Sequence, residues 1–253
     1  DIGDFYYTPP TGYLALCTSN LPAVAVTPSE HFNTVLYTGT GSNQDITGVG
    51  FRPDFVWAKD RSAGHSHMLT DKVRGIYKTL NSDNYYGEGS LVTALRSFNA
   101  DGFSVGSNAN INNNGSNFAA WNWKANGSGS SNTNGSINTT ATSANVDAGF
   151  SIITYTGTGT NGATVGHGLS KAPEMIIIRN RDANSNWPVY HHKNTSAPET
   201  DYIKLDTTAA TADNATFWND TAPTSSVFTL GTDADLNTNG DKHIAYCFHS
   251  VDG

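Results

Sequence analysis

Short apolar runs alternate with turns rich in Gly, Asn and Pro along most of the chain. Residues 150–155 are small, β-branched or aromatic and end in a Gly-rich turn, as a strand does. Residues 175–178 form a continuous apolar run of strand length, which fits a strand covered on both faces of a sandwich. Asn-Gly pairs at 114–115 and 239–240 mark tight hairpins. No convincing amphipathic helix interrupts this pattern, which therefore predicts an all-β, antiparallel fold.

Five sequence blocks occur twice in the same order. Tyr-Thr-Gly-Thr-Gly stands at 37–41 and again at 155–159, and residues 51–59 match 171–179 in pattern. The other blocks pair residues 103–106 with 228–231, 110–115 with 235–240, and 118–123 with 243–248. We therefore predict two tandem antiparallel β-sandwich domains, jelly-roll-like in form, that arose by internal duplication.

The blocks place a first sandwich repeat at 31–124 and a second at 149–253. Residues 125–148 between them are rich in Gly, Ser and Asn and poor in apolar residues, which is typical of a flexible linker. Residues 1–30 contain an aromatic stretch followed by a Pro-punctuated one. We expect them to end a preceding domain and to continue as a connector.

Composition and charge narrow the class of protein. Charged residues make up 14% of the chain and hydrophobic residues 37%, while Gly, Asn, Ser and Thr are abundant, as in extracellular β-proteins and virus fibres. A net charge of −8 without a basic stripe argues against a nucleic-acid partner. No apolar run is long enough to span a membrane, so membrane insertion is not expected. Cys247 stands in an alternating run and is expected to be a small buried thiol.

Two histidine pairs lie in the middle regions of the two repeats. Histidine pairs bind transition metals, and together with aromatic side chains they can line a sugar or partner pocket. The candidate ligand-binding residues are His65, His67, Trp187, Tyr190, His191 and His192. Structural or loop roles are the alternative, and a metal shared between chains on a three-fold axis is a further one.

A loop of the second repeat offers oxygen ligands at alternate positions, which a hard cation such as Ca²⁺ accepts. The candidate metal ligands are Asp233, Asp235, Asn237 and Asp241. The first repeat has Asn108, Asn110 and Asn112 at the matching positions, without the charge that tight binding needs. A solvated hairpin is therefore the alternative, and we expect no cofactor apart from this candidate Ca²⁺ site.

Two further patterns bear on enzymatic chemistry. Residues 157–162 satisfy G-x-G-x-x-G after a strand, but no helix follows, so the pattern indicates a turn and not a nucleotide site. The carboxylates of Asp54, Asp71, Glu88 and Asp101 could hydrolyse a glycan only if the fold brings two of them within about 5–10 Å. We assign no catalytic residue and expect no enzyme.

Several stretches support a family resemblance. Residues 7–22, which begin Tyr-Thr-Pro-Pro-Thr-Gly-Tyr, resemble the segment that closes a SPRY-like, concanavalin-type sandwich in phage tail proteins. The two repeats are similar to a tandem β-rich domain of marine and cyanobacterial phage virion proteins, through residues 50–59, 71–75, 121–125 and 224–231. The resemblance implies a virion or extracellular location, a homo-oligomer (a trimer in particular) and contact with other virion proteins. It implies no catalytic residue.

Three functions follow as expectations. The leading one is a structural and host-recognition module of a phage tail fibre or virion appendage, which binds a host surface glycan or protein without catalysis. The alternative is a secreted carbohydrate-binding or adhesin module that binds glycan through exposed aromatic residues such as Trp187 or Trp218. A glycan depolymerase is the third, and it needs a carboxylate pair. Solution mass separates the first two, since a trimer favours the fibre module and a monomer favours the solitary one.

Overall fold

The structure, a computed structural model, describes residues 7, 10–11 and 26–251. The segment predicted at 1–30 lies mostly outside these residues. The described chain is built from sheets whose strand pairs are antiparallel, with two one-turn α-helices and the 3₁₀ turn η2 (Pro28–Glu30). The prediction of an all-β, antiparallel fold is confirmed. No helix in the described part of the chain is long and apolar enough to cross a membrane.

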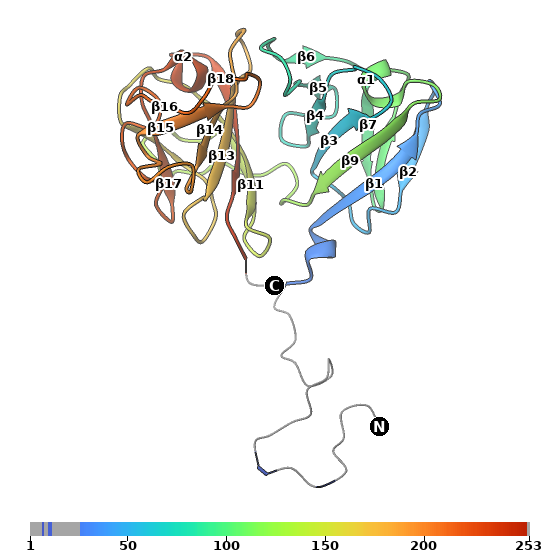
Figure 1. Ribbon diagram of the computed structural model, residues 1–253, viewed down its shortest axis with the longest axis horizontal. Helices are drawn as coiled ribbons and strands as arrows, with labels where there is room; N and C mark the ends of the chain where they lie inside the picture. Colours follow the sequence, from blue (N-terminus) through green and yellow to red (C-terminus); the bar gives the residue numbers. More distant parts are fainter. Residues whose placement is uncertain (1–6, 8–9, 12–25, 252–253) are drawn as a thin grey trace.

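The first half of the chain folds into two facing sheets (Figure 1). One sheet has the strand order β1 (Phe32–Thr38), β9 (Asn117–Trp123), β3 (Phe55–Asp60) and β4 (Met68–Asp71). The other has the order β2 (Gln44–Thr47), β8 (Gly102–Val105) and β7 (Leu95–Asn99). The short strands β5 (Lys78–Thr79) and β6 (Gly89–Ser90) pair beside β4, and the helix α1 (Ala109–Asn112) precedes β9.

The second half repeats this plan with additions. Its large sheet has the order β10 (Ala141–Asn145), β11 (Phe150–Thr156), β18 (Lys242–Phe248), β13 (Met175–Asn180), β14 (Pro188–His191), β15 (Asp201–Lys204) and β16 (Ala212–Asp213). The facing sheet pairs β12 (Ala163–Gly166) with β17 (Val227–Leu230). The helix α2 (Ala234–Asn237) precedes β18 as α1 precedes β9.

Equivalent hydrogen bonds recur in the two halves. The hydroxyl of Tyr37 donates to the carbonyl of Ile111 at 2.6 Å, and that of Tyr155 donates to the carbonyl of Leu236 at 2.8 Å. The strand order β1-β9-β3-β4 matches β11-β18-β13-β14. The halves thus share one architecture, while their origin by duplication stays a prediction.

Each half has its own apolar core between its two sheets, and a third cluster lies between the halves. Ile176 and Ile178 of β13 belong to the core of the second half, whereas Ile177 between them belongs to the cluster between the halves. The prediction that 175–178 is covered on both faces is therefore confirmed. Cys247 is fully buried in the core of the second half, as predicted, and burial raises the pKa of its thiol.

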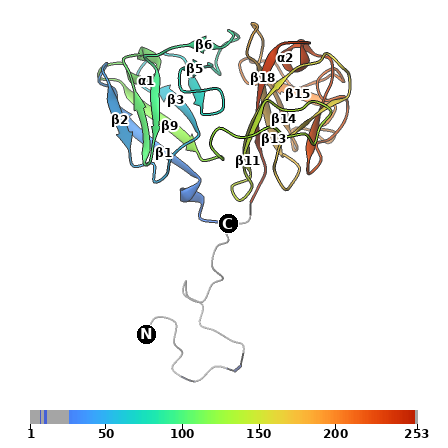
Figure 2. The same ribbon diagram turned by 180° about the vertical axis from the view of Figure 1, so that it is seen from behind.

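The two large sheets face each other across the middle of the molecule (Figures 1 and 2). Phe55 and Trp123 of the first half meet Phe150, Tyr246 and Phe248 of the second, with ring centroids 4.4–6.2 Å apart. Such offset aromatic pairs contribute about 0.5–1.5 kcal/mol beyond the burial of their area. The halves are consequently one packed unit, joined in part by this aromatic cluster.

Residues 125–148 are packed where we expected a flexible linker. They contain β10, which pairs with β11 at the edge of the large sheet, and Ile137, which bridges to Val165 of β12. The segment is poor in apolar residues, but its hydroxyl and amide groups bond to one another, as when Thr139 Oγ1 accepts from the N–H of Asn132 at 2.8 Å. Backbone pairing at two sheet edges therefore orders a stretch that composition alone marks as mobile.

Candidate functional site

His65 and His67 lie on the loop between β3 and β4. The Nδ1 atom of His65 is 2.8 Å from Oδ2 of buried Asp60. The backbone carbonyl of His65 accepts a hydrogen bond from the Lys59 ammonium. The indole N–H of Trp57 donates to Nδ1 of His67 at 3.0 Å, and burial together with the charge of Lys59 lowers the pKa of His67. These histidines therefore have local structural partners.

Trp187 and Tyr190 are core residues, with 0% and 4% of their surface exposed. The indole N–H of Trp187 donates to the carbonyl of Asn81 across the interface at 2.9 Å. Trp218 is 2% exposed and bonds through its indole N–H to the carbonyl of Asp201. The expectation that Trp187 or Trp218 presents an exposed sugar-binding face is wrong, because Trp187 is buried in the cluster between the halves and Trp218 in the core of the second half.

His191 and His192 lie at the end of β14, beside Glu174 and His249 in a shallow surface recess. The two imidazole rings are 5.4 Å apart, and Nδ1 of His192 is 3.9 Å from Oε1 of Glu174. By strand register, His191 matches Asp71 of the first half, so the two histidine pairs do not occupy equivalent positions.

The four candidate metal ligands are each held by protein groups. Asp233 caps α2 by accepting from the N–H of Asp235, and burial raises the pKa of Asp233. Asp235 accepts from Ser185 and Asn186, Asn237 accepts from Thr158, and Asp241 accepts from Asn180. Nowhere in residues 7, 10–11 and 26–251 do three or more His, Cys, Asp or Glu side chains form a group that could hold a metal ion. The side-chain oxygens of the four candidate ligands thus hold local structure, and asparagines do the same at the matching positions of the first repeat.

The four carboxylates considered for hydrolysis also have structural partners. Asp54 accepts from the N–H groups of Ala125 and Gly127, and Asp101 accepts from those of Gly48 and Gly50.

Asp71 and Glu88 both bind Arg74 within the interface between the halves. Burial works to raise the pKa of Glu88, but the hydrogen bond from Arg181 and the charges of Arg74 and Arg181 hold it below its usual value. A general acid needs a raised pKa instead.

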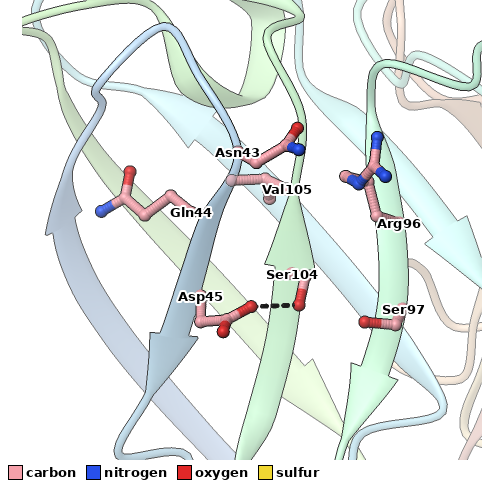
Figure 3. Close-up of a pocket in the computed structure, with 7 residues that line it drawn as sticks. All are labelled: Asn43, Gln44, Asp45, Arg96, Ser97, Ser104 and Val105. Carbon is pink, nitrogen blue, oxygen red and sulfur yellow. Dashed lines mark hydrogen bonds between the residues drawn. The ribbon is translucent and has the colours of Figure 1, made fainter.

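A polar groove of about 380 Å³ lies on the outer face of the three-stranded sheet of the first half (Figure 3). Figure 3 shows Asp45, Ser104, Ser97 and Arg96 side by side on three neighbouring strands. The lining residues are Asn43, Gln44, Asp45, Arg96, Ser97, Ser104 and Val105.

Strand alternation builds this face of the sheet. Ile46, Phe103 and Leu95 point into the core, so the neighbouring positions on β2, β8 and β7 point outward. Asp45 lies opposite Ser104, and Ser104 lies opposite Ser97. The outer face thus carries a ladder of polar side chains across three strands.

A β-bulge places Arg96 over the same face. Leu95 lies opposite Val105 and Ser97 lies opposite Ser104, so Arg96 is an extra residue without a partner of its own across the ladder. Bulges re-aim a side chain in this way next to binding sites. No ion pair or hydrogen bond holds the guanidinium of Arg96 among the residues that the structure describes.

Hydrogen bonds along the groove order its other polar groups. The hydroxyl of Ser104 donates to Asp45 and accepts from Asn99 Nδ2 at 2.8 Å, while Ser97 donates to Asn99 Oδ1 at 2.8 Å. Gln44 Nε2 donates to the carbonyl of Thr38, and among the described residues Gln44 Oε1 has no hydrogen-bond partner. The groove therefore offers one anionic group, one cationic group, and neutral donors and acceptors between them.

The matching place in the second half is closed by the chain itself. Thr164 and Thr229 stand where the first half has Asp45 and Ser104. Ser136 N donates to Thr164 Oγ1 at 2.9 Å, and Ile137 N donates to the carbonyl of Thr164 at 3.0 Å. Gly135 permits this approach, because a Cβ on it would lie 2.3 Å from the Thr164 carbonyl oxygen.

Sequence reasoning missed every residue of the groove. The outward positions of β2, β8 and β7 are polar in the sequence, which is the only signal, and it is shared with any solvated strand. The bulge at Arg96 and the difference between the halves appear only in three dimensions.

Comparison of the chain with curated proteins and with solved structures returned no match. A family model, described as a domain of unknown function (DUF7483), matches residues 27–253. The matched region includes both halves and the packed segment between them, and the chain therefore belongs to the DUF7483 family.

Proposed function

We propose that the chain is a structural and host-recognition module of a phage tail fibre or other virion appendage, which binds a surface glycan in the polar groove of its first half without catalysis. One observation carries the proposal. The groove is open and polar in the first half, whereas Ser136 and Ile137 of the chain itself bind Thr164, the residue that matches Asp45, in the second.

The lining of the groove suits a carbohydrate. Sugar hydroxyls both donate and accept hydrogen bonds, and the groove presents the carboxylate of Asp45, the guanidinium of Arg96 and the hydroxyl of Ser97 within one face. Hydrogen bonds to charged groups contribute about 1.5–3 kcal/mol each.

A non-catalytic role fits the same lining. Glycan hydrolysis uses two carboxyl groups on either side of the scissile bond. Asp45 is the one carboxylate among the residues that line the groove. This supports binding over turnover, and an assay for released reducing sugar would detect a depolymerase.

The virion setting rests on the sequence resemblance and on a composition poor in charge and rich in Gly, Asn, Ser and Thr. A secreted carbohydrate-binding module would use the same groove, so it shares the binding prediction and differs in its setting.

Titration calorimetry of the full chain against fragments of bacterial surface polysaccharide tests the proposal. We expect Arg96→Ala and Asp45→Ala each to weaken binding at least about tenfold, the loss of one charged hydrogen bond. Arg52→Ala is the matched control, because Arg52 is an exposed arginine of the first half outside the groove. Equal binding by Arg96→Ala and Arg52→Ala, or no binding by the wild type to any fragment, would overturn the proposal.

A further inference from the structure

The strand β1 forms an open edge of the large sheet in the first half. It pairs with β9 on one side, and within residues 7, 10–11 and 26–251 no strand pairs with its other side. The matching strand of the second half, β11, is flanked by β18 on one side and by β10 on the other. One half is therefore complete at this edge and the other is one strand short.

The hydrogen bonds of β1 show which groups face outward. His31 and Gly39 bond to the β9 side, and antiparallel pairing alternates, so Phe32, Thr34, Leu36 and Thr38 direct their N–H and C=O groups away from β9. Thr34 N–H bonds to Asn33 Oδ1, and Gln44 bonds to the Thr38 carbonyl. Among the described residues the peptide groups of Leu36 have no partner on the open side, at the centre of the edge.

Two of the exposed side chains at this edge are apolar, and the other two are the threonines Thr34 and Thr38. Leu36 is 66% exposed and Phe32 is 40% exposed, and they lie on the same face of the sheet because they are an even number of residues apart. None of the residues of β1 carries a charge. Natural proteins protect an edge of this kind with charges, prolines or a covering element, because it otherwise pairs with other chains.

The residues just before β1 differ from those just before β11. In the second half, a turn between β10 and β11 brings β10 alongside β11. Gly149 ends that turn with φ 63°, and a Cβ on it would lie 2.3 Å from the carbonyl oxygen of His249. By strand register, His31 occupies the same place before β1, with φ −127°. The first half thus lacks the glycine turn with which the second half returns its preceding strand to the edge.

We propose that β1 pairs antiparallel with β1 of a second copy of this chain across a two-fold axis. Leu36 of one copy then faces Leu36 of the other, and the N–H of each donates to the carbonyl of the other. The large sheet of the first half in one copy thereby continues into the same sheet of the second copy. An uncharged strand brings no like charges together in such a pair, and the exposed Leu36 and Phe32 of each copy gain apolar neighbours. The contact is isologous and closes, so it gives a dimer.

The test measures the mass of the full chain by sedimentation over a range of concentrations. We expect a dimer for the wild type and a monomer for Leu36→Lys, which places two ammonium groups against each other at the axis. Val92→Lys is the matched control, since Val92 is a 60% exposed aliphatic residue of the first half away from the edge, and it should remain a dimer. An equimolar mixture of Leu36→Lys and Leu36→Glu should recover a dimer, which would also show that both variants fold.

Hydrogen exchange at the Leu36 amide gives a second measurement. Protection that rises with protein concentration agrees with pairing between copies. A wild type that is monomeric at all concentrations, a trimer, or a dimer that Leu36→Lys leaves intact would each overturn the proposal. A monomer whose Leu36 amide is protected would do so as well, because the chain's own residues would then cover the edge. Glycan binding in the groove lies on the other sheet, so the two proposals fail independently.

Discussion

Phe55 of the first half stacks on Tyr246 of the second, with ring centroids 4.4 Å apart and 20° between the ring planes. Both rings are about 99% buried. The contact joins β3 of one large sheet to β18 of the other, so it lies where the two halves are held together.

Replacing Phe55 by Ala should therefore destabilise the whole molecule. We expect Phe55→Ala to lower the free energy of unfolding by about 3–5 kcal/mol, because it leaves a cavity and removes the stack. Urea unfolding followed by tryptophan fluorescence measures the change. Tyr85→Ala, at a 52% exposed aromatic residue, should change it by no more than about 0.5 kcal/mol. Equal losses in the two variants would show that the interface contributes little.

Arg74 links the halves through a buried polar network. Its Nε donates to Asp71 Oδ2 at 2.5 Å, its Nη1 donates to Glu88 at 3.2 Å, and Asp71 also accepts from the hydroxyl of Tyr246 at 2.9 Å. Arg74→Met would leave the Asp71 carboxylate buried without its cation, so we expect a loss of about 3–5 kcal/mol in unfolding free energy.

Adding Asp71→Asn to Arg74→Met supplies the check on that cause. The double variant should recover part of the stability, because the unpaired charge is gone. If the double variant is less stable than the single one, the loss comes from packing and not from the buried charge.

His243 stacks on Tyr155 with 5.2 Å between ring centroids, where the first half has the pair Phe118 and Tyr37 at 5.1 Å. Burial lowers the pKa of His243 from 6.5 to about 4. The folded state therefore keeps His243 neutral, and its contribution to stability is full above pH 6.5 and is lost as the pH falls from 6.5 to about 4.

His243→Phe copies the first half and removes this titration. Between pH 7 and pH 4.5 we expect the variant to lose about 2 kcal/mol less unfolding free energy than the wild type. His167, whose pKa burial also lowers to about 4, keeps part of the pH dependence in both proteins. Identical slopes of unfolding free energy against pH in wild type and variant would contradict the prediction.

Asn237 is a fully buried hub in the second half, and Asn112 repeats it in the first. Its Oδ1 accepts from the N–H of Thr158 at 2.9 Å, and its Nδ2 donates to the carbonyls of Thr160 and Gly231 at 3.0 and 2.7 Å. We expect Asn237→Ala to cost about 2–3 kcal/mol, since it removes the bonds to three backbone groups, of which the Gly231 carbonyl is buried. Thr238→Ala removes an exposed hydroxyl next to it and should cost less than about 1 kcal/mol in the same urea experiment. A similar cost for both would show that Asn237 does not hold the loop.

Much of the frame could be predicted because it depends on local rules. Strand and turn signals occur once in each half of the sequence: an Asn-Gly hairpin, a proline before β3 or β13, and a closing aromatic run. The apolar run 175–178 indicates a strand covered on both faces, because a solvated face would need polar residues at every second position.

The rest depends on contacts between residues far apart in the sequence. Residues 125–148 read as mobile because they contain few apolar side chains, yet two open sheet edges bind and order them. Trp187 and Trp218 look like free sugar platforms in the sequence, whereas the interface and the core of the second half bury them.

The sequence by itself determined the all-β class and the pattern shared by the two halves, since side-chain alternation and turn residues act over a few positions. Only the tertiary structure decided that the halves pack face to face, that Arg96 stands over an open polar groove, and that β1 is left as an edge. Each of these depends on which strand ends beside which, and residue pairs such as Phe55 with Tyr246 are separated by most of the chain. Backbone pairing and burial set such contacts, and no short stretch of sequence contains both partners.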